Sequence, residues 1–269
     1  MKEESLMKLK STFQRRETKY ILAMWEYDAL RLGLLPYMQE DEYGLHTILS
    51  LYCDTTDYQL IQRSIDKPKY KEKFRVRSYG VPTDDSLTFL EIKKKFQKVV
   101  YKRRLALPCE ETADYLRHPR LLPFSTPKEN QLMQEIHWLY GRQQLAPKVL
   151  IAYDRRALYS TEPALADFRV TFDFAIRYRR EQLDLRSGDL GELVAPEVEV
   201  LMEVKALGAY PLWFSHLLTQ LGLVKSSFSK YAQVYQRHIL PTLQMEGTRH
   251  VKQFTNRQSD HHELVNLYL

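Results

Sequence analysis

Positive and apolar side chains alternate, residue by residue, along six separate stretches of this 269-residue chain. In one of them, Lys73, Arg75 and Arg77 take every second position, while Phe74 and Val76 fill the positions between them. Successive side chains of a β-strand point to opposite faces of a sheet, so this pattern predicts half-buried strands with one cationic and one apolar face. For any single strand, an ordinary sheet whose polar face meets water is the simpler explanation.

Considered together, the stretches argue against solvated faces. Solvated strand faces usually mix signs with Thr, Ser and Gln, whereas these faces are dominated by Lys and Arg. Like charges directly opposite one another on paired strands repel, which suggests a polyanion that relieves the repulsion. The helices also need a surface for their apolar stripes, and the apolar strand faces supply one. We therefore expect an α+β fold: a closed antiparallel β-barrel tunnel of about eight strands, with cationic faces inward and helices packed outside.

The elements expected from periodicity fill one domain over residues 1–245, followed by a polar C-terminal tail over residues 246–269. Strands are expected at residues 13–22, 45–53, 71–79, 87–95, 99–107, 148–158, 168–177 and 197–206. Helices are expected at residues 24–35, 58–63, 110–116, 127–140, 211–221 and 228–240.

The overall charge also points to an anionic partner. The chain carries 40 Lys and Arg against 34 Asp and Glu, a formal net charge of +6. Charge alone leaves nucleic acid, a membrane surface and polyphosphorylated small molecules open as that partner. Neither GxxxxGK[ST] nor GxGxxG occurs, which excludes the P-loop and Rossmann phosphate-binding motifs.

Cysteine usage and hydropathy indicate the compartment. Cys53 and Cys109 form neither a CxxC pair nor a disulfide framework, which favours a reducing environment. The N-terminal residues lack the apolar core of a signal peptide, and no stretch approaches the roughly 18 apolar residues of a membrane span. We therefore expect a cytoplasmic protein, which a membrane-protein partner could bring to a membrane.

Eight short strings, in order along residues 13–240, resemble a known family. They are Arg16-Glu-Thr-Lys-Tyr20, Tyr52-Cys-Asp-Thr-Thr-Asp-Tyr58, Arg75-Val-Arg77, Glu91-Ile-Lys93, Tyr153-Asp-Arg155, Arg169-Val-Thr-Phe-Asp173, Glu203-Val-Lys205 and Phe228-Ser-Lys-Tyr231. Together they resemble the polyphosphate polymerase domain of the vacuolar transporter chaperone (VTC) complex, which belongs to the CYTH or triphosphate tunnel metalloenzymes. The resemblance implies a β tunnel that binds ATP and polyphosphate, and a translocating membrane complex as partner.

The resemblance also implies a set of site residues, matched motif by motif. The phosphate-holding catalytic set is Lys19, Arg75, Arg77, Lys93, Arg155 and Arg169. The surrounding substrate-binding set is Lys102, Tyr153, Lys205, Ser229 and Lys230, with Lys98, Arg103 and Arg104 as alternatives to Lys102. Glu203 is expected to hold Mg²⁺ or Mn²⁺, because a carboxylate cannot face phosphate without a bridging cation. The alternative for Glu203 is a salt bridge to Lys205 or to a neighbouring arginine.

One departure from the family pattern bears on the reaction. Hydrolytic and cyclase members carry an ExExK signature on the first strand, and here only Glu17 and Lys19 match it. Fewer carboxylates mean fewer metal ligands, which disfavours a metal-activated water. The leading hypothesis is therefore a polyphosphate polymerase that transfers the γ-phosphoryl group of ATP to a growing chain.

Three alternatives to the polymerase stay open. The first is a hydrolase of tripolyphosphate or nucleoside triphosphates, and the second is a noncatalytic subunit that binds polyphosphate or inositol phosphate. The third is a nucleic-acid binder, which is the weakest because base stacking needs aromatic side chains beside the cations. Tyr79, Tyr101 and Tyr153 fall on mixed faces, so nucleic acid is not expected as a partner.

Overall fold

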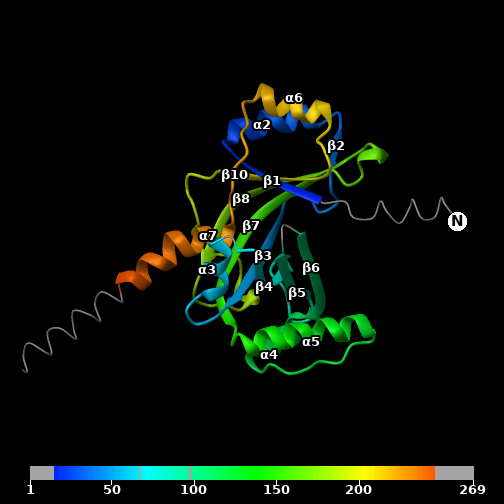
Figure 1. Cartoon of the computed structure of the whole chain (residues 1–269). Helices are drawn as coiled ribbons and strands as arrows, with labels where there is room; N and C mark the ends of the chain where they lie inside the picture. The colour runs from blue at the N-terminus through cyan, green and yellow to red at the C-terminus, as the bar shows by residue number, and fades with distance from the viewer. Residues whose placement is uncertain (1–14, 67, 97–98, 246–269) are drawn as a thin grey trace, which may run out of the picture.

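The centre of the molecule is a large antiparallel sheet with helices packed around it (Figure 1). The computed structural model describes residues 15–66, 68–96 and 99–245. In sheet order the strands are β1 (Arg15–Leu22), β10 (Val200–Leu207), β8 (Arg169–Arg179), β7 (Ala146–Ser160), β3 (His46–Asp54), β4 (Tyr70–Tyr79), β5 (Leu87–Phe96) and β6 (Val99–Pro108). Each of these strands was predicted, whereas the short strands β2 (Met38–Glu40) and β9 (Glu192–Leu193) were not.

The sheet is not closed into a barrel, so that part of the predicted fold class was wrong. Among the described residues, no backbone pairing joins β1 to β6. The free edge of β1 is occupied instead by Ser226, whose N–H donates to the Lys19 carbonyl at 2.8 Å. The sheet still curls strongly, because Lys93 Nζ of β5 lies 3.9 Å from Glu17 Oε2 of β1, and these are the seventh and first strands in the sheet order.

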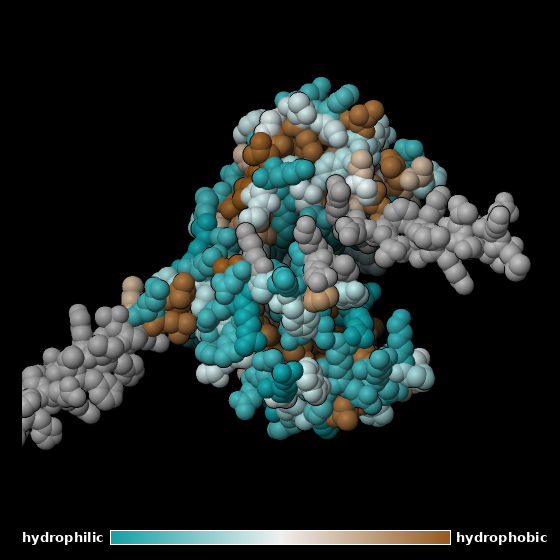
Figure 2. All heavy atoms as spheres, in the orientation of Figure 1, coloured by the Kyte–Doolittle hydropathy of each residue, from teal (hydrophilic) through white to brown (hydrophobic). Residues whose placement is uncertain are grey.

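Two pairs of helices cover the outer, apolar face of the curled sheet at opposite ends (Figure 1). Helices α2 (Met24–Leu34) and α6 (Leu212–Gln220) pack on β1, β8 and β10, and helices α4 (Cys109–Arg117) and α5 (Pro127–Arg142) pack on β3 to β6. Apolar side chains also reach the surface around α2 and α6 (Figure 2). In the described part of the chain, no helix has the length and hydropathy that a membrane crossing requires.

The start of α5 illustrates how the sequence sets these helices. The side chain of Thr126 accepts a hydrogen bond from the Glu129 N–H, and Pro127 fills the first helical position, where no backbone donor is needed. Thr126 and Pro127 thus fix the residue at which α5 begins, which agrees with the helix expected from residue 127. Both cysteines are buried free thiols, as expected for structural residues.

The third helical group lies on the inner face of the sheet, which corrects the expectation that all helices pack outside. Helix α3 (Gln59–Ile65) and helix α7 (Lys230–Val234), which continues as a π-helix over Tyr235–Ile239, pack on Tyr52 and Tyr153. Both tyrosines share the inner face with the arginines of β4, since Tyr52 pairs with Arg75 in register. We call this face, which α7 covers at one end, the concave face.

A buried carboxylate ties α3 to α7. Asp54, at the end of β3, accepts hydrogen bonds from the N–H groups of Thr55, Leu60 and Ile61, and from the Tyr231 hydroxyl at 2.9 Å. Burial raises the pKa of Asp54, and the four donors oppose that rise. The Tyr52-Cys-Asp-Thr-Thr-Asp-Tyr58 string therefore fixes the position of α7 relative to the sheet.

The Tyr231→Phe variant is expected to lose about 2 kcal/mol of unfolding free energy, because it removes one hydrogen bond to a buried carboxylate. Tyr115→Phe is the matched control, since Tyr115 is equally buried but its hydroxyl has no hydrogen-bond partner in the described structure. That control is expected to be as stable as the parent. Urea unfolding of both variants measures the difference, and equal losses would contradict the role given to Asp54.

Candidate functional site

The first polar cluster on the concave face surrounds Asp173, a fully buried residue of β8. Arg155 of β7 donates to both carboxylate oxygens of Asp173, at 2.5 Å from Nε and 2.7 Å from Nη2. Lys230 of α7 donates to Asp173 Oδ2 at 2.5 Å, and its Nζ lies 3.6 Å from Glu203 Oε1. Glu203 of β10 also lies 3.4 Å from Arg155 and 3.0 Å from Lys19 Nζ of β1. We call these five residues the Asp173 cluster.

The charges within the Asp173 cluster hold one another in the ionised state. Burial alone would raise the pKa of Glu203, but Lys230, Lys19 and Arg155 outweigh it and hold that pKa well below its usual range. Arg155 and Lys230 likewise overcome burial and lower the pKa of Asp173. Burial opposes the charge on Lys230, but the two carboxylates raise its pKa. Three cations thus face two carboxylates, which leaves positive charge in a mostly buried site.

A second cluster on the concave face surrounds Glu91 of β5, which is 2% exposed. Arg75 Nε lies 2.7 Å from Glu91 Oε2, and Lys102 Nζ lies 2.8 Å from Oε1. Arg77 is more distant, with Nε at 3.9 Å from Oε2. Burial alone would raise the pKa of Glu91, but Arg75, Arg77 and Lys102 lower it to about 2. One carboxylate therefore serves three cations in this group, which we call the Glu91 cluster.

Tyr153 of β7 lies between the two clusters. Arg77 Nη2 donates to its hydroxyl at 3.4 Å. The Arg155 guanidinium lies 5.1 Å from its ring centroid and Lys230 Nζ lies 4.3 Å from it, which are cation–π distances. Burial alone would raise the pKa of Tyr153, but Arg77, Arg155 and Lys230 lower it. The predicted residues of β1, β4, β7, β10 and α7 are thus parts of one continuous cationic surface.

Three predicted residues lie at the margin of this surface. Lys93 is half exposed and has Glu17 as its ion-pair partner. Lys205 lies two residues after Glu203 on β10 and opposite Arg169 in register. Arg169 is 46% exposed and pairs with Asp41 at 3.2 Å. The structure therefore does not bring Arg169 into either cluster.

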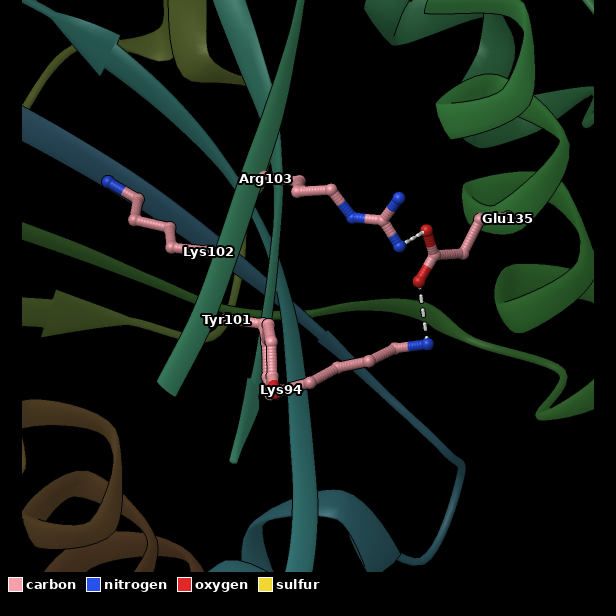
Figure 3. A pocket seen from close by; sticks show the side chains of 5 residues that line it. All are labelled: Lys94, Tyr101, Lys102, Arg103 and Glu135. Atoms are coloured by element: carbon pink, nitrogen blue, oxygen red, sulfur yellow. Dashed lines mark hydrogen bonds and ion pairs between the residues drawn. The ribbon is translucent and has the colours of Figure 1, made fainter. Parts of the chain in front are cut away.

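The side chains of β6 point alternately to the two sides of the sheet, which decides among the alternatives to Lys102 (Figure 3). Arg103 points toward α5 and pairs with Glu135 there, so it is turned away from the concave face. Lys102 points to the opposite side, toward Glu91. Arg104 also faces inward, with its guanidinium carbon 4.8 Å from the centroid of the Phe89 ring of β5. Lys98 lies outside the described residues. A cavity of about 540 Å³ at this outer edge is lined by Lys94, Tyr101, Lys102, Arg103 and Glu135.

Comparison with known proteins identifies the family. The profile of the VTC domain matches residues 14–239 of the chain. The chain belongs to the VTC domain family. No curated protein matches it in sequence.

Two solved structures resemble this VTC domain at low sequence identity. One is a candidate adenylyl cyclase from Hippeastrum, described as having a dominant triphosphatase activity, with 14% identity, a TM-score of 0.49 and coverage of 83% of this chain and 95% of that chain. The other is a candidate adenylate cyclase from Vibrio parahaemolyticus, with 10% identity, a TM-score of 0.44 and coverage of 82% and 97%. Similarities this distant carry no argument about activity.

The VTC domain's concave face offers a divalent cation few protein ligands. No group of three or more His, Cys, Asp or Glu side chains with ligand geometry occurs among the described residues. Both oxygens of Glu203 already contact cations. Its Oε2 contacts Arg155, which is the neighbouring arginine of the predicted alternative, and its Oε1 contacts Lys19 and Lys230 instead of Lys205. A Mg²⁺ or Mn²⁺ ion commonly uses one or two carboxylates and completes its shell with phosphate oxygens and water. Glu203 fits an ion of that kind, bound together with phosphate.

Sequence reasoning missed the part that two carboxylates play. Asp173 and Glu91 belong to the strings that carry the resemblance but were given no role, because alternation identifies a face and not the partner across it. Their signal was present in the sequence, since an acidic residue on an otherwise cationic inner face needs a cationic partner. Lys73 was also left without a role, and its Nζ donates to the predicted residue Ser229 at 3.3 Å.

Proposed function

We propose that this VTC domain is a polyphosphate polymerase, which transfers the γ-phosphoryl group of ATP to the end of a polyphosphate chain on the concave face. The observation that carries the proposal is the pair of cation clusters built around Asp173 and Glu91 and joined through Tyr153. In each cluster the cations outnumber the carboxylates. Such an excess in a mostly buried site calls for a multiply charged anion.

One buried donor supports a phosphate ligand in particular. Arg77 is 7% exposed, and its Nε has no hydrogen-bond partner in the described structure. A guanidinium can donate in parallel to two oxygens of one phosphate, and Arg77 keeps that capacity. Arg155, in contrast, is already fixed by its two hydrogen bonds to Asp173. Arg77 is therefore assigned to the phosphate chain, and Arg155 with Lys230 to a phosphoryl group at the Asp173 cluster.

The proposed reaction needs little from the side chains beyond position and charge. The bond between the β–γ bridging oxygen and the γ-phosphorus breaks, a bond from a terminal phosphate oxygen of the chain to that phosphorus forms, and ADP leaves. The attacking oxygen is already largely deprotonated at neutral pH, because the second phosphate pKa is about 6, so no general base is required. Lys19, Arg155 and Lys230 stabilise the negative charge that moves to the leaving group.

Glu203 is the residue that would hold a divalent cation in this reaction. When bound, Mg²⁺ or Mn²⁺ neutralises phosphate oxygens that would otherwise face the Glu203 carboxylate. Lys19 and Lys230 keep Glu203 ionised and oriented, because both contact its Oε1. In this assignment Glu203 supplies one ligand of the metal ion, and oxygens of the substrate supply most of the others.

The experiment that tests the proposal is incubation of the purified protein with ATP and Mn²⁺, followed by gel electrophoresis of the products. Chains that lengthen with time, with one ADP released for each unit added, are the expected result. Release of orthophosphate without polymer would identify a triphosphatase. Tight binding of tripolyphosphate with neither product would identify a binding subunit. Lys128→Met, an exposed lysine on α5 far from the concave face, is the matched control and is expected to behave as the parent.

A further inference from the structure

Strand β6 leaves one edge of the large sheet open. Among the described residues it pairs with β5 on one side and with no strand on the other. At the opposite end of the strand order, the edge of β1 is occupied in part by Ser226, which forms a bridge to Lys19. Every second residue of an edge strand points its N–H and C=O away from the sheet, so β6 can pair with a further extended segment.

Aromatic side chains gather on the outer face of the sheet beside this edge. Tyr70 of β4 is opposite Phe96 of β5, and Tyr101 of β6 is opposite Lys94 of β5, so these four side chains share one face. Farther along the strands the same face is buried, since Phe74 packs against α5. The three aromatic residues, in contrast, are between 46% and 57% exposed. We call Tyr70, Phe96 and Tyr101 the aromatic strip.

The open edge is cationic. Strand β6 has no acidic residue and carries three consecutive cations, Lys102, Arg103 and Arg104. Arg103 and Lys94 converge on a single carboxylate, Glu135 of α5, from which Lys94 Nζ lies 2.6 Å (Figure 3). Glu72 also lies on the outer face, but two strands from the edge, where it accepts a hydrogen bond from the Tyr70 hydroxyl. The edge itself therefore favours an acidic partner.

Charge also separates the segments that could occupy the edge. Two copies of β6 that pair about a twofold axis near Arg103 place Lys and Arg directly opposite Lys and Arg, which is destabilising. Residues 1–14 and 246–269 of the chain have no excess of acidic over basic residues. Cations along an edge also discourage aggregation, but that role does not account for the aromatic strip or for the cavity of about 540 Å³ beside Tyr101 and Arg103.

We propose that the edge of β6 is a docking site for an extended acidic segment of a partner protein. The segment adds a strand to the sheet through backbone hydrogen bonds to β6. An acidic side chain opposite Arg103 shares the guanidinium with Glu135, and an apolar or aromatic side chain of the segment packs on the aromatic strip. Arg103 is turned away from the concave face, so this site does not depend on the proposed function.

Titration with a short blocked peptide, in which a run of glutamates is flanked by valine and tyrosine, tests the docking site. The peptide is expected to bind and to slow the amide hydrogen exchange of β6. Arg103→Gln is expected to weaken binding about tenfold. Lys128→Gln is the matched control, because it removes one exposed charge from α5 and is expected to change the affinity less than twofold. The same peptide with lysines in place of the glutamates is expected not to bind.

Four results would overturn the docking site. The first is a glutamate peptide that does not bind, and the second is equal affinity for Arg103→Gln and the parent. The third is slowed exchange confined to β4 and β7 and reversed by tripolyphosphate, which would place the peptide on the concave face. The fourth is slow exchange of β6 in the protein alone. If that protection grows with protein concentration, the occupant is a second copy, and if it does not, the occupant is a segment of the same chain.

Discussion

The Asp173→Asn variant is expected to lose about 3 kcal/mol of unfolding free energy and to be stabilised by tripolyphosphate more than the parent is. Asp173 is fully buried and neutralises Arg155 and Lys230. Removal of one member of a buried ion-pair network leaves the other charges without compensation, which typically costs 3 to about 5 kcal/mol. A phosphate chain can supply the missing negative charge, so ligand should restore much of the loss.

Thermal unfolding with and without tripolyphosphate measures both effects for Asp173→Asn. Glu197→Gln is the matched control, because Glu197 pairs with Arg237 at the surface, where solvent screens an ion pair and it contributes little to stability. That control is expected to unfold like the parent and to respond to ligand like the parent. A variant at Asp173 that is as stable as the parent, or that gains no more from the ligand, would contradict the network described for this cluster.

The Glu203→Gln variant is expected to lose at least about a hundredfold in turnover while it binds tripolyphosphate more tightly. Turnover falls because the variant removes the only carboxylate assigned to a metal ion, and losses of a preorganised charge at a reacting centre are commonly of this size. Binding tightens because Lys19, Arg155 and Lys230 lose a counter-charge that competes with phosphate. A gain of about tenfold in affinity corresponds to only about 1.4 kcal/mol.

Steady-state turnover with Mn²⁺ and titration with tripolyphosphate in EDTA measure the two effects separately. The conservative Glu203→Asp variant keeps the charge with a shorter side chain, and it is expected to recover part of the turnover without the gain in affinity. Unchanged turnover in Glu203→Gln would remove Glu203 from the reaction. Weaker binding in that variant would show that the carboxylate organises the three cations and does not compete with the ligand.

The strands could be predicted from the sequence because the alternation of side chains between the two faces of a strand depends only on neighbouring residues. The run around Arg75 and Arg77 shows which side chains share a face, and the structure confirms that assignment in register with Glu91. Closure of the sheet could not be predicted, because it depends on which segment occupies the free edge of β1. Ser226 lies more than 200 residues from Lys19 in sequence, and nothing in its surroundings reads as a strand.

The sequence predicted which site residues share a strand face. It could not predict which of them meet in space, because that depends on the order of the strands in the sheet. Arg155 and Lys230 come together because both reach the same buried carboxylate, which periodicity alone does not reveal. Arg169 was placed with them by its motif, but it is the first residue of β8, where it pairs with Asp41. Helix α7 begins two residues later than predicted, and its π-helical turn has no signal in the apolar pattern.

No backbone hydrogen bonds join the first and last strands of the sheet among the described residues, so its width is not fixed by a closed ladder. A barrel closed by backbone hydrogen bonds has a diameter fixed by strand number and shear. Here the described contact between Glu17 and Lys93 spans the interior, and a partly exposed pair of this kind is worth no more than about 1 kcal/mol. Under the proposed function, a polyanion that draws Lys93 away from Glu17 therefore breaks no described rung of the β-ladder.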